Sequence, residues 1–223
     1  MKNQQTQIAY VLDRSGSMQH LAESAIASFN EFVREQKAEG DDASLTLVLF
    51  DDQYEVPYEN LPIKEVPDLD ANTYTARGST ALLDAVGRTI DQLQKQLKDQ
   101  PIGLSPAKVV VAIFTDGYEN SSIDFDWKKI SAKIRDCREN HDWEFLFLGA
   151  NQDAIATASQ MSIERSSTSR VQFSAAGIQS CSKSYSRKIR AMRRMQKGEW
   201  VEDLDKPMDE IVKEEGGSPE DQA

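Results

Sequence analysis

Residues 8–17 read IAYVLDRSGS, an apolar run that passes directly into turn-forming polar residues. This pattern predicts a buried strand over residues 8–12 that ends in a loop beginning at Asp13. Apolar positions then recur at helical spacing over residues 18–37 and stop near Gly40, where helices commonly end. The chain therefore opens with a strand, a polar loop at the strand's carboxyl end, and a helix.

The same alternation continues through most of the chain. Further strands are predicted over residues 45–50, 54–58, 108–114, 143–148 and 171–173, and further helices over residues 80–97, 127–140, 153–160 and 175–195. Residues 108–114 form a near-continuous apolar run, which is typical of a central parallel strand covered on both faces. The short turn at residues 51–53 makes the 54–58 strand an antiparallel hairpin partner of its neighbour, and Pro57, Pro62 and Pro67 place it at an edge. We predict an α/β fold with a doubly wound, mostly parallel six-stranded sheet, one antiparallel edge strand and helices on both faces.

Charge changes sign along the last quarter of the chain. The helix over residues 175–195 and the residues just after it carry a cluster of basic side chains, namely Lys183, Arg187, Lys188, Arg190, Arg193, Arg194 and Lys197. Acidic residues dominate from residue 199 onward. We predict one domain over residues 1–197, with a core at 6–161 and a terminal strand and basic helix at 171–197, followed by a flexible acidic tail over residues 198–223. The basic helix could be a solvated face, a docking surface for the acidic tail, or a nucleic-acid contact.

Bulk composition narrows the class of protein. The net charge of −11 over 223 residues opposes binding to nucleic acid or to an anionic membrane through a general electrostatic field. The sequence contains no secretory leader pattern and no apolar run of about 18 residues, so we expect a cytoplasmic protein without a membrane contact. Its two cysteines, Cys137 and Cys181, show neither a zinc-ligand spacing nor a disulfide framework, so we expect free thiols.

Five oxygen-bearing residues follow predicted strands or begin predicted helices: Asp13, Ser15, Ser17, Thr80 and Asp116. Ligands of doubly wound sheets collect at the carboxyl ends of the strands, so these side chains are expected to meet. Carboxylates and hydroxyls suit a hard divalent cation, with Mg²⁺ expected first and Mn²⁺ or Ca²⁺ as alternatives. Only two of the five are carboxylates, so the ion would keep an open position for an acidic group from elsewhere. The simpler alternative is that the residues of the first loop only cap a helix.

Three sequence elements resemble the metal-ion-dependent adhesion site (MIDAS) of von Willebrand factor A (VWA) domains. They are DRSGS at residues 13–17, GSTALLDA at 78–85 and TDG at 115–117, and the resemblance covers residues 6–161. It implies a complete MIDAS in an intracellular member of prokaryotic or phage type, one that acts alone or with an ATPase or kinase system. It also implies direct ligation by Ser15 and Ser17, ligation by Thr80 directly or through water, and contacts of Asp13 and Asp116 largely through water.

We therefore predict a non-enzymatic module that binds an acidic residue of a partner protein through the cation. One alternative is a structural or assembly subunit in which the metal only stabilises the loops. Another is a metal-dependent phosphohydrolase, but the haloacid-dehalogenase type needs an acid at the position of Ser15. A tail carboxylate such as Glu202, Asp203 or Asp205 could also cap the metal of its own or a neighbouring chain. Several other residues are expected around the ion, where they would shape partner choice: His20, Tyr74, Arg77, Tyr118, Glu119 and Asn120.

Overall fold

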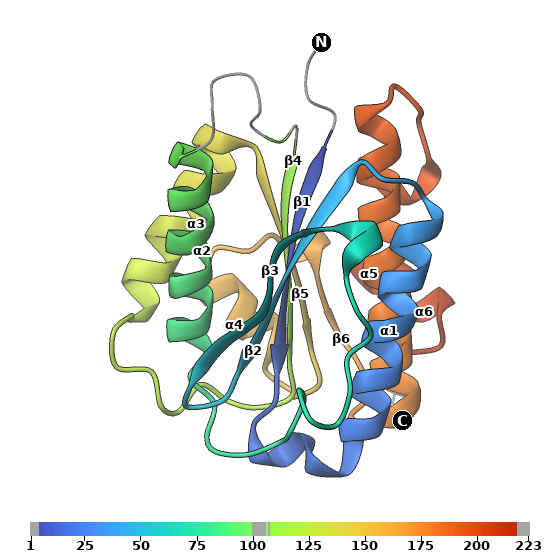
Figure 1. The fold of residues 1–223 in the computed structure, drawn as a ribbon. Coiled ribbons are helices and arrows are strands. Elements are labelled where there is room, and N and C mark those ends of the chain that lie inside the picture. Colours follow the sequence, from blue (N-terminus) through green and yellow to red (C-terminus); the bar gives the residue numbers. More distant parts are fainter. Residues whose placement is uncertain (1–4, 100–105, 107, 218–223) are drawn as a thin grey trace.

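A six-stranded sheet forms the centre of the protein in a computed structural model that describes residues 5–99, 106 and 108–217 (Figure 1). The strands lie in the order β3-β2-β1-β4-β5-β6. Their bounds are β1 Thr6–Asp13, β2 Ala43–Phe50, β3 Tyr54–Pro62, β4 Lys108–Thr115, β5 Trp143–Gly149 and β6 Thr168–Arg170. Only β3 pairs antiparallel with its neighbour, and every other pair in this sheet is parallel. The predicted fold class is thereby confirmed.

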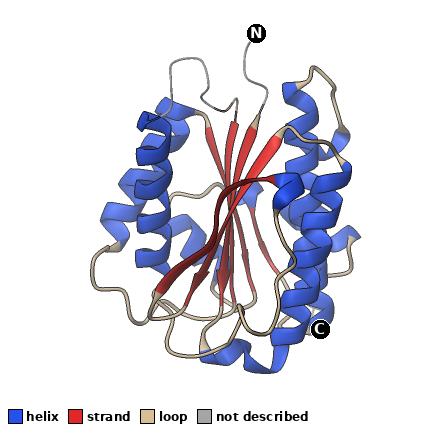
Figure 2. Cartoon of the chain, in the orientation of Figure 1, coloured by secondary structure: helices blue, strands red, loops and turns tan. Residues whose placement is uncertain are grey.

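Helices cover both faces of the sheet, as Figures 1 and 2 show. One face carries α1 Ala22–Ala38, α5 Ala175–Gln196 and α6 Met208–Glu214, and the other carries α2 Leu82–Asp99, α3 Trp127–His141 and α4 Ala154–Gln160. Short 3₁₀ helices are η1 Gly16–Leu21, η2 Ile63–Glu65, η3 Arg165–Ser167 and η4 Glu202–Leu204. No helix in the described part of the chain is both long and apolar enough to span a bilayer.

The burial of each strand agrees with its position in the sheet. All eight positions of β4 are buried because helices cover both of its faces, as its near-continuous apolar sequence predicts. β3 is only partly buried and contains Pro57 and Pro62, and it lies at the edge of the sheet. Proline has no amide hydrogen to donate to a neighbouring strand, and at the edge of the sheet there is no further strand that needs one.

Two element boundaries differ from the sequence prediction. Helix α2 begins at Leu82 rather than at residue 80, because the amide of Ala81 bonds to the Asp51 carbonyl and holds the preceding segment in a loop. The last strand is Thr168–Arg170 rather than residues 171–173. The β5 ladder ends at Gly149, which pairs with Arg170, so the chain beyond that point has no strand left to pair with.

The predicted flexible acidic tail differs from the structure up to Gly217. Met208, Ile211 and Val212 of α6 are fully buried and belong to the same core cluster as α1 and α5. Their spacing is the apolar repeat of a helix, which the acidic residues around them obscured. The folded unit therefore extends through Gly217, and residues 218–223 of the predicted tail lie outside the described residues.

Basic residues of α5 hold this C-terminal segment in place. The Arg187 guanidinium makes a bidentate contact with Asp203, at 3.0 and 2.6 Å, and also reaches Glu214 and Glu215. The Lys188 ammonium donates to three main-chain carbonyls, two in η4 and that of Lys206 just before α6. Three interpretations of the basic helix were open, and the structure shows that its basic side chains bind the acidic C-terminal segment.

Candidate metal site

The five predicted ligands lie on loops at the carboxyl edge of the parallel strands, where β1 runs into η1 in Figure 1. Asp13 ends β1, Ser15 lies just before η1, and Ser17 lies in the first turn of η1. Asp116 follows β4, and Thr80 precedes α2. Because β1 and β4 are adjacent parallel strands whose following helices cover opposite faces, this is a topological switch point of the sheet.

Asp13 is fully buried and organises the loop that follows it. Its Oδ1 accepts a hydrogen bond from the Ser15 amide at 2.7 Å, and its Oδ2 accepts one from the Thr115 hydroxyl at 2.5 Å. The Tyr74 hydroxyl donates to the main-chain carbonyl of Asp13 at 2.7 Å. The carboxylate thus ties the end of β1 to the end of β4 and fixes the direction of the Ser15 backbone.

Three side-chain oxygens from two loops converge beside it. The Ser15 and Ser17 hydroxyl oxygens are 3.1 Å apart, and Ser15 Oγ lies 3.5 Å from Asp116 Oδ1. Ser15 is buried and Ser17 is exposed, so the cluster opens to solvent on one side.

Thr80 is held against the loop that follows β4 by two contacts with Asn120. Its amide donates to Asn120 Oδ1 at 3.0 Å, and its carbonyl accepts from the Asn120 amide at 3.1 Å. A Cβ on Gly117 would lie 2.7 Å from Thr80 Oγ1, so the threonine hydroxyl faces the backbone next to Asp116. Only glycine permits this close approach.

Gly78 joins the loop before α2 to the loop after β1. Its carbonyl accepts from the Gly16 amide at 3.1 Å, its φ is +67°, and a Cβ would lie 2.0 Å from Asp52 Oδ1. The left-handed backbone favours a glycine at this position.

The two carboxylates of the cluster have raised pKa values. Burial, and then the charge of Asp116, raise the pKa of Asp13 to about 7. Burial is also the main cause of the raised pKa of Asp116. Two neighbouring carboxylates in a desolvated setting disfavour each other's charged form, and a divalent cation between them would remove that penalty.

The donor set fits a hard cation. It consists of carboxylate and hydroxyl oxygens, which are the ligand types that Mg²⁺, Mn²⁺ and Ca²⁺ prefer. Among the residues that the structure describes, no group of three or more His, Cys, Asp or Glu side chains is placed to hold a metal. A cation here would therefore depend on the hydroxyls of serine and threonine as well as on the two aspartates.

A buried ionic network supports the loops, and its central residue, Asp51, is not among the predicted site residues. Asp51 is fully buried, and its Oδ2 accepts from Arg14 Nε at 3.0 Å and from Arg77 Nε at 2.8 Å. Both guanidinium groups also reach Glu55. The strand-end position of Asp51, in the turn between β2 and β3, was the only sequence signal for this role.

Glu119 has a different task from the one predicted. Its Oε2 accepts from the Leu83 amide at 2.9 Å, so it caps the start of α2, and its Oε1 accepts from the amides of Ser121 and Ser122 in its own loop. Asp84 of α2 reciprocates by accepting from the amides of Ile123, Asp124 and Phe125 at 3.1, 3.0 and 2.9 Å. These bonds hold the loop after β4 against the start of α2.

The remaining predicted neighbours of the ion occupy different positions. Asn120 supports Thr80 and Tyr74 supports Asp13, as described above, while Tyr118 is 56% exposed. His20 lies close enough to Asp116 for its charge to oppose the rise in that carboxyl's pKa.

The three tail carboxylates predicted as metal caps have partners of their own away from this edge. Asp203 pairs with Arg187, Glu202 pairs with Lys206, and Asp205 accepts from the Trp200 indole N–H. The structure therefore uses these three groups to hold the C-terminal segment.

Comparisons with known proteins place the fold. No family model matches the sequence, and no curated protein matches it. Among solved structures, a von Willebrand factor type A protein from Catenulispora acidiphila is similar, with a TM-score of 0.55, 14% identity, and coverage of 84% of this chain and 43% of that one. Manganese-loaded TRAP protein from Plasmodium vivax matches with a TM-score of 0.54, 17% identity, and coverage of 78% and 70%.

A third similar structure is proximal thread matrix protein 1 from the mussel byssus, with a zinc-occupied MIDAS motif. It has a TM-score of 0.57, 12% identity, and coverage of 80% of this chain and 46% of that one. This chain thus spans less than half the length of the first and third of these proteins. Together the likenesses show a VWA-like fold for this chain.

Proposed function

We propose that this chain is a metal-dependent protein-binding module of the MIDAS type. One divalent cation would be held by Asp13, Ser15, Ser17, Thr80 and Asp116 and would bind an Asp or Glu of a partner protein. The observation that carries the proposal is the convergence of oxygens from two loops, with Ser15 Oγ at 3.1 Å from Ser17 Oγ and 3.5 Å from Asp116 Oδ1.

The balance of charge in the ligand set supports an acidic partner. Two carboxylates and three neutral hydroxyls leave a hard cation short of both ligands and negative charge. Such an ion attracts a further carboxylate. Both Asp13 oxygens already accept protein hydrogen bonds, which favours contact of Asp13 with the ion through water while the serine hydroxyls bind it directly.

Mg²⁺ is the cation we propose, on the basis of the oxygen ligands. Two proteins of similar fold are described as manganese-loaded and as zinc-occupied at a MIDAS motif, which supports a divalent cation in general. The resemblance of the three loop motifs further suggests a cytoplasmic protein whose partner belongs to an ATPase or kinase system.

We propose binding rather than catalysis. A phosphohydrolase of the haloacid-dehalogenase type would need an acid where this chain has Ser15, and Ser15 is already engaged with Ser17 and Asp116. The structural alternative, a cation that only stabilises the loops, predicts metal binding without affinity for a carboxylate. That difference can be measured.

The ligand set is tested by calorimetric titration of Mg²⁺ and Mn²⁺. We expect Thr80→Val and Asp116→Asn each to weaken metal binding by tenfold or more, because each removes an oxygen ligand or a charge. Ser79→Ala is the matched control, since Ser79 is the exposed neighbour of Thr80, and it should keep the affinity of the unmodified chain. Equal affinities in all these variants would reject the site.

Carboxylate binding is tested separately, by NMR titration with acetyl-aspartate amide. Shifts of amides at residues 13–17 and 116–120 should appear with Mg²⁺ and disappear with EDTA, and acetyl-asparagine amide should produce none. Metal binding without an effect of the aspartate probe would favour the structural alternative.

A further inference from the structure

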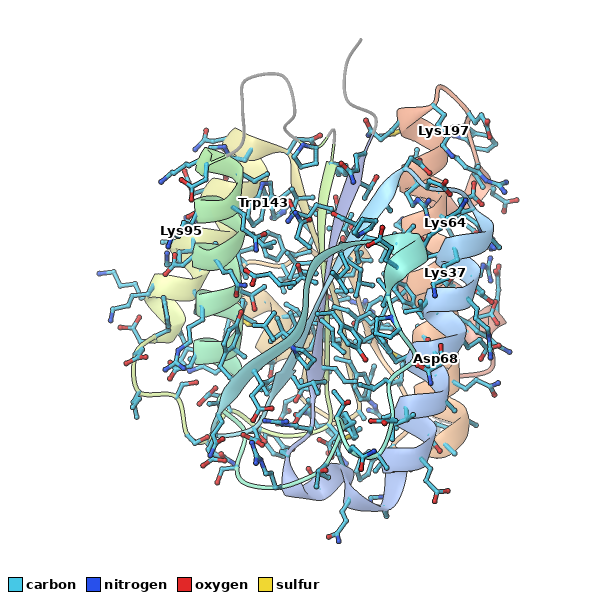
Figure 3. All side chains as sticks on the ribbon, in the orientation of Figure 1. Lys37, Lys64, Asp68, Lys95, Trp143 and Lys197 are labelled. Atoms are coloured by element: carbon cyan, nitrogen blue, oxygen red, sulfur yellow. The ribbon has the colours of Figure 1, made fainter. Side chains whose placement is uncertain are left out.

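Large exposed hydrophobic side chains gather at the edge of the sheet that carries the candidate site. In the part of the chain that the structure describes they number six: Tyr118, Ile123, Ile155, Phe173, Met195 and Trp200. The first four lie on connections at the carboxyl ends of β4, β5 and β6. The last two flank Lys197, which Figure 3 labels at the opposite end of the molecule.

Two of these four residues have direct links to the candidate ligands. Tyr118 is 56% exposed and follows Gly117, the residue that faces the Thr80 hydroxyl. Phe173 is 42% exposed and meets the His20 ring edge-on at 4.9 Å between centroids. His20 in turn lies in η1, the same short helix that contains Ser17.

A third residue extends the same surface. Ile155 lies in the first turn of α4, just beyond Asn151, whose side-chain amide donates to the Gly117 carbonyl at 3.0 Å. Ile123 is 87% exposed, but its amide donates to Asp84 in the first turn of α2, a helix that packs against β1 and β2, so it lies off this surface. We call Tyr118, Ile155 and Phe173 the apolar flank.

The opposite side of the candidate site has a different character. Over β2 and β3 the loops are held by the buried Arg14–Asp51 pair, and the surface there carries Arg77 and Glu55, which pair with each other. The apolar flank therefore adjoins the proposed cation on the β4–β6 side. Exposed apolar clusters of this kind commonly mark protein-binding surfaces.

We infer that the apolar flank is the second half of the partner-binding surface and that the partner segment carries aromatic or large aliphatic residues next to the acidic residue that binds the cation. Two features define the partner segment. Its carboxylate would bind the proposed ion, and its apolar side chains would contact the surface that continues from the ion toward β6. Aromatic contacts at the centre of an interface contribute much of its binding energy. The inference rests on the proposed function and adds the class of partner to it.

Two peptide probes test the inference by NMR titration in Mg²⁺: acetyl-Phe-Asp-Phe-amide and acetyl-Gly-Asp-Gly-amide. We expect the phenylalanine probe to bind about tenfold more tightly, as burial of one aromatic side chain would give. In the Tyr118→Ala/Phe173→Ala double variant the two probes should bind almost equally. Equal binding of the probes to the unmodified chain, or an unchanged preference in the double variant, would overturn the inference.

Matched controls distinguish binding to the apolar flank from non-specific hydrophobic binding and from binding to the metal site. Trp200→Ala removes an aromatic side chain that is 70% exposed at the far end, and it should leave the preference intact. Loss of the preference in Trp200→Ala would also overturn the inference. If the glycine probe binds in Mg²⁺ and not in EDTA while the preference is absent, the proposed function stands and only the apolar flank fails.

The chain's own C-terminal residues are the remaining occupant to exclude. The carbonyl of Gly217 accepts from the Gln172 amide at 2.9 Å, so the chain continues from a point next to Phe173. The titrations are therefore repeated on a chain that ends at Gly217, and the same preference is expected. Binding of both probes only after this truncation would assign the surface to residues 218–223 and overturn the inference.

Discussion

Asp51 Oδ2 accepts a hydrogen bond of 3.0 Å from Arg14 Nε, and both side chains are buried. The same oxygen accepts from Arg77 Nε at 2.8 Å, while the Asp51 carbonyl accepts from the Ala81 amide. One residue of the β2–β3 turn thus holds both the loop that carries the serines and the loop that carries Thr80. The geometry of the candidate site depends on a residue that contributes no ligand to it.

Replacing Asp51 by alanine is expected to lower the free energy of unfolding by about 3 kcal/mol, because it leaves the buried Arg14 guanidinium without its main partner. Urea denaturation followed by circular dichroism measures this change. Asp52→Ala is the control, since Asp52 is the exposed neighbour in the same turn, and it should cost under about 0.5 kcal/mol. Similar losses in the two variants would contradict the central role of Asp51.

Metal should stabilise the folded chain, and the effect should depend on Asp116. At Mg²⁺ concentrations about 100 times the dissociation constant, binding to the folded state alone adds about 2.7 kcal/mol to the free energy of unfolding. The difference between urea curves in Mg²⁺ and in EDTA should disappear in Asp116→Asn. In EDTA this variant should be at least as stable as the unmodified chain, because it removes a negative charge beside Asp13. A large loss of stability in EDTA would show that Asp116 has a structural role instead.

The C-terminal segment should contribute to global stability. Ile211→Ala removes a fully buried side chain from the core shared with α1 and α5, so we expect a loss of about 3 kcal/mol. Lys213→Ala, at an exposed position of the same helix, should change stability little. Both are measured by urea denaturation. A negligible effect of Ile211→Ala would show that this segment behaves as a flexible tail.

Acid should weaken the attachment of α6 before it unfolds the sheet. The Arg187 guanidinium lowers the pKa of Asp203 and contributes with Lys206 to the lowered pKa of Glu214. A carboxylate with a lowered folded-state pKa stabilises the fold above its ordinary pKa, here 3.8 for Asp203 and 4.5 for Glu214. That stabilisation is lost as the pH falls below these values and through the folded-state pKa.

The measurement is the free energy of unfolding against pH, for the unmodified chain and for Arg187→Met. We expect the variant to be less stable near pH 7 and to lose less stability on acidification, so that the two curves converge at low pH. Amide hydrogen exchange in residues 208–214 should report the weakening locally. Parallel curves would show that Arg187 does not set these carboxyl pKa values.

The sequence predicted the elements whose signal is local. The apolar run of β4 and the helical repeat of α1 each specify an element without reference to the rest of the chain, and the motif at residues 13–17 placed its polar residues at a strand end. The set of five ligands remains a prediction, although the structure brings their oxygens to one edge. The contacts that support them, such as Asp51 with Arg14 or Asp84 with the loop after β4, join residues 37 to 41 positions apart and leave no pattern along the chain.

Two further differences have related causes. β6 has three residues, so its pairing with β5 rather than its own composition decides where it lies. In α6 the acidic residues suggested a solvated segment, while three apolar side chains and the basic face of α5 decided its position. Composition indicated the complementary charges but not that the segment folds.

The route of the chain also bears on how the protein can be handled. Gly217 bonds to Gln172 beside Phe173, at the edge of the sheet that carries the candidate site, whereas β1 starts at Thr6 on the opposite edge (Figure 1). A fluorescent label or an immobilisation tag fused after Gly217 would emerge next to the surface under study and obstruct it. The same tag joined ahead of Thr6 would orient that surface toward the solution.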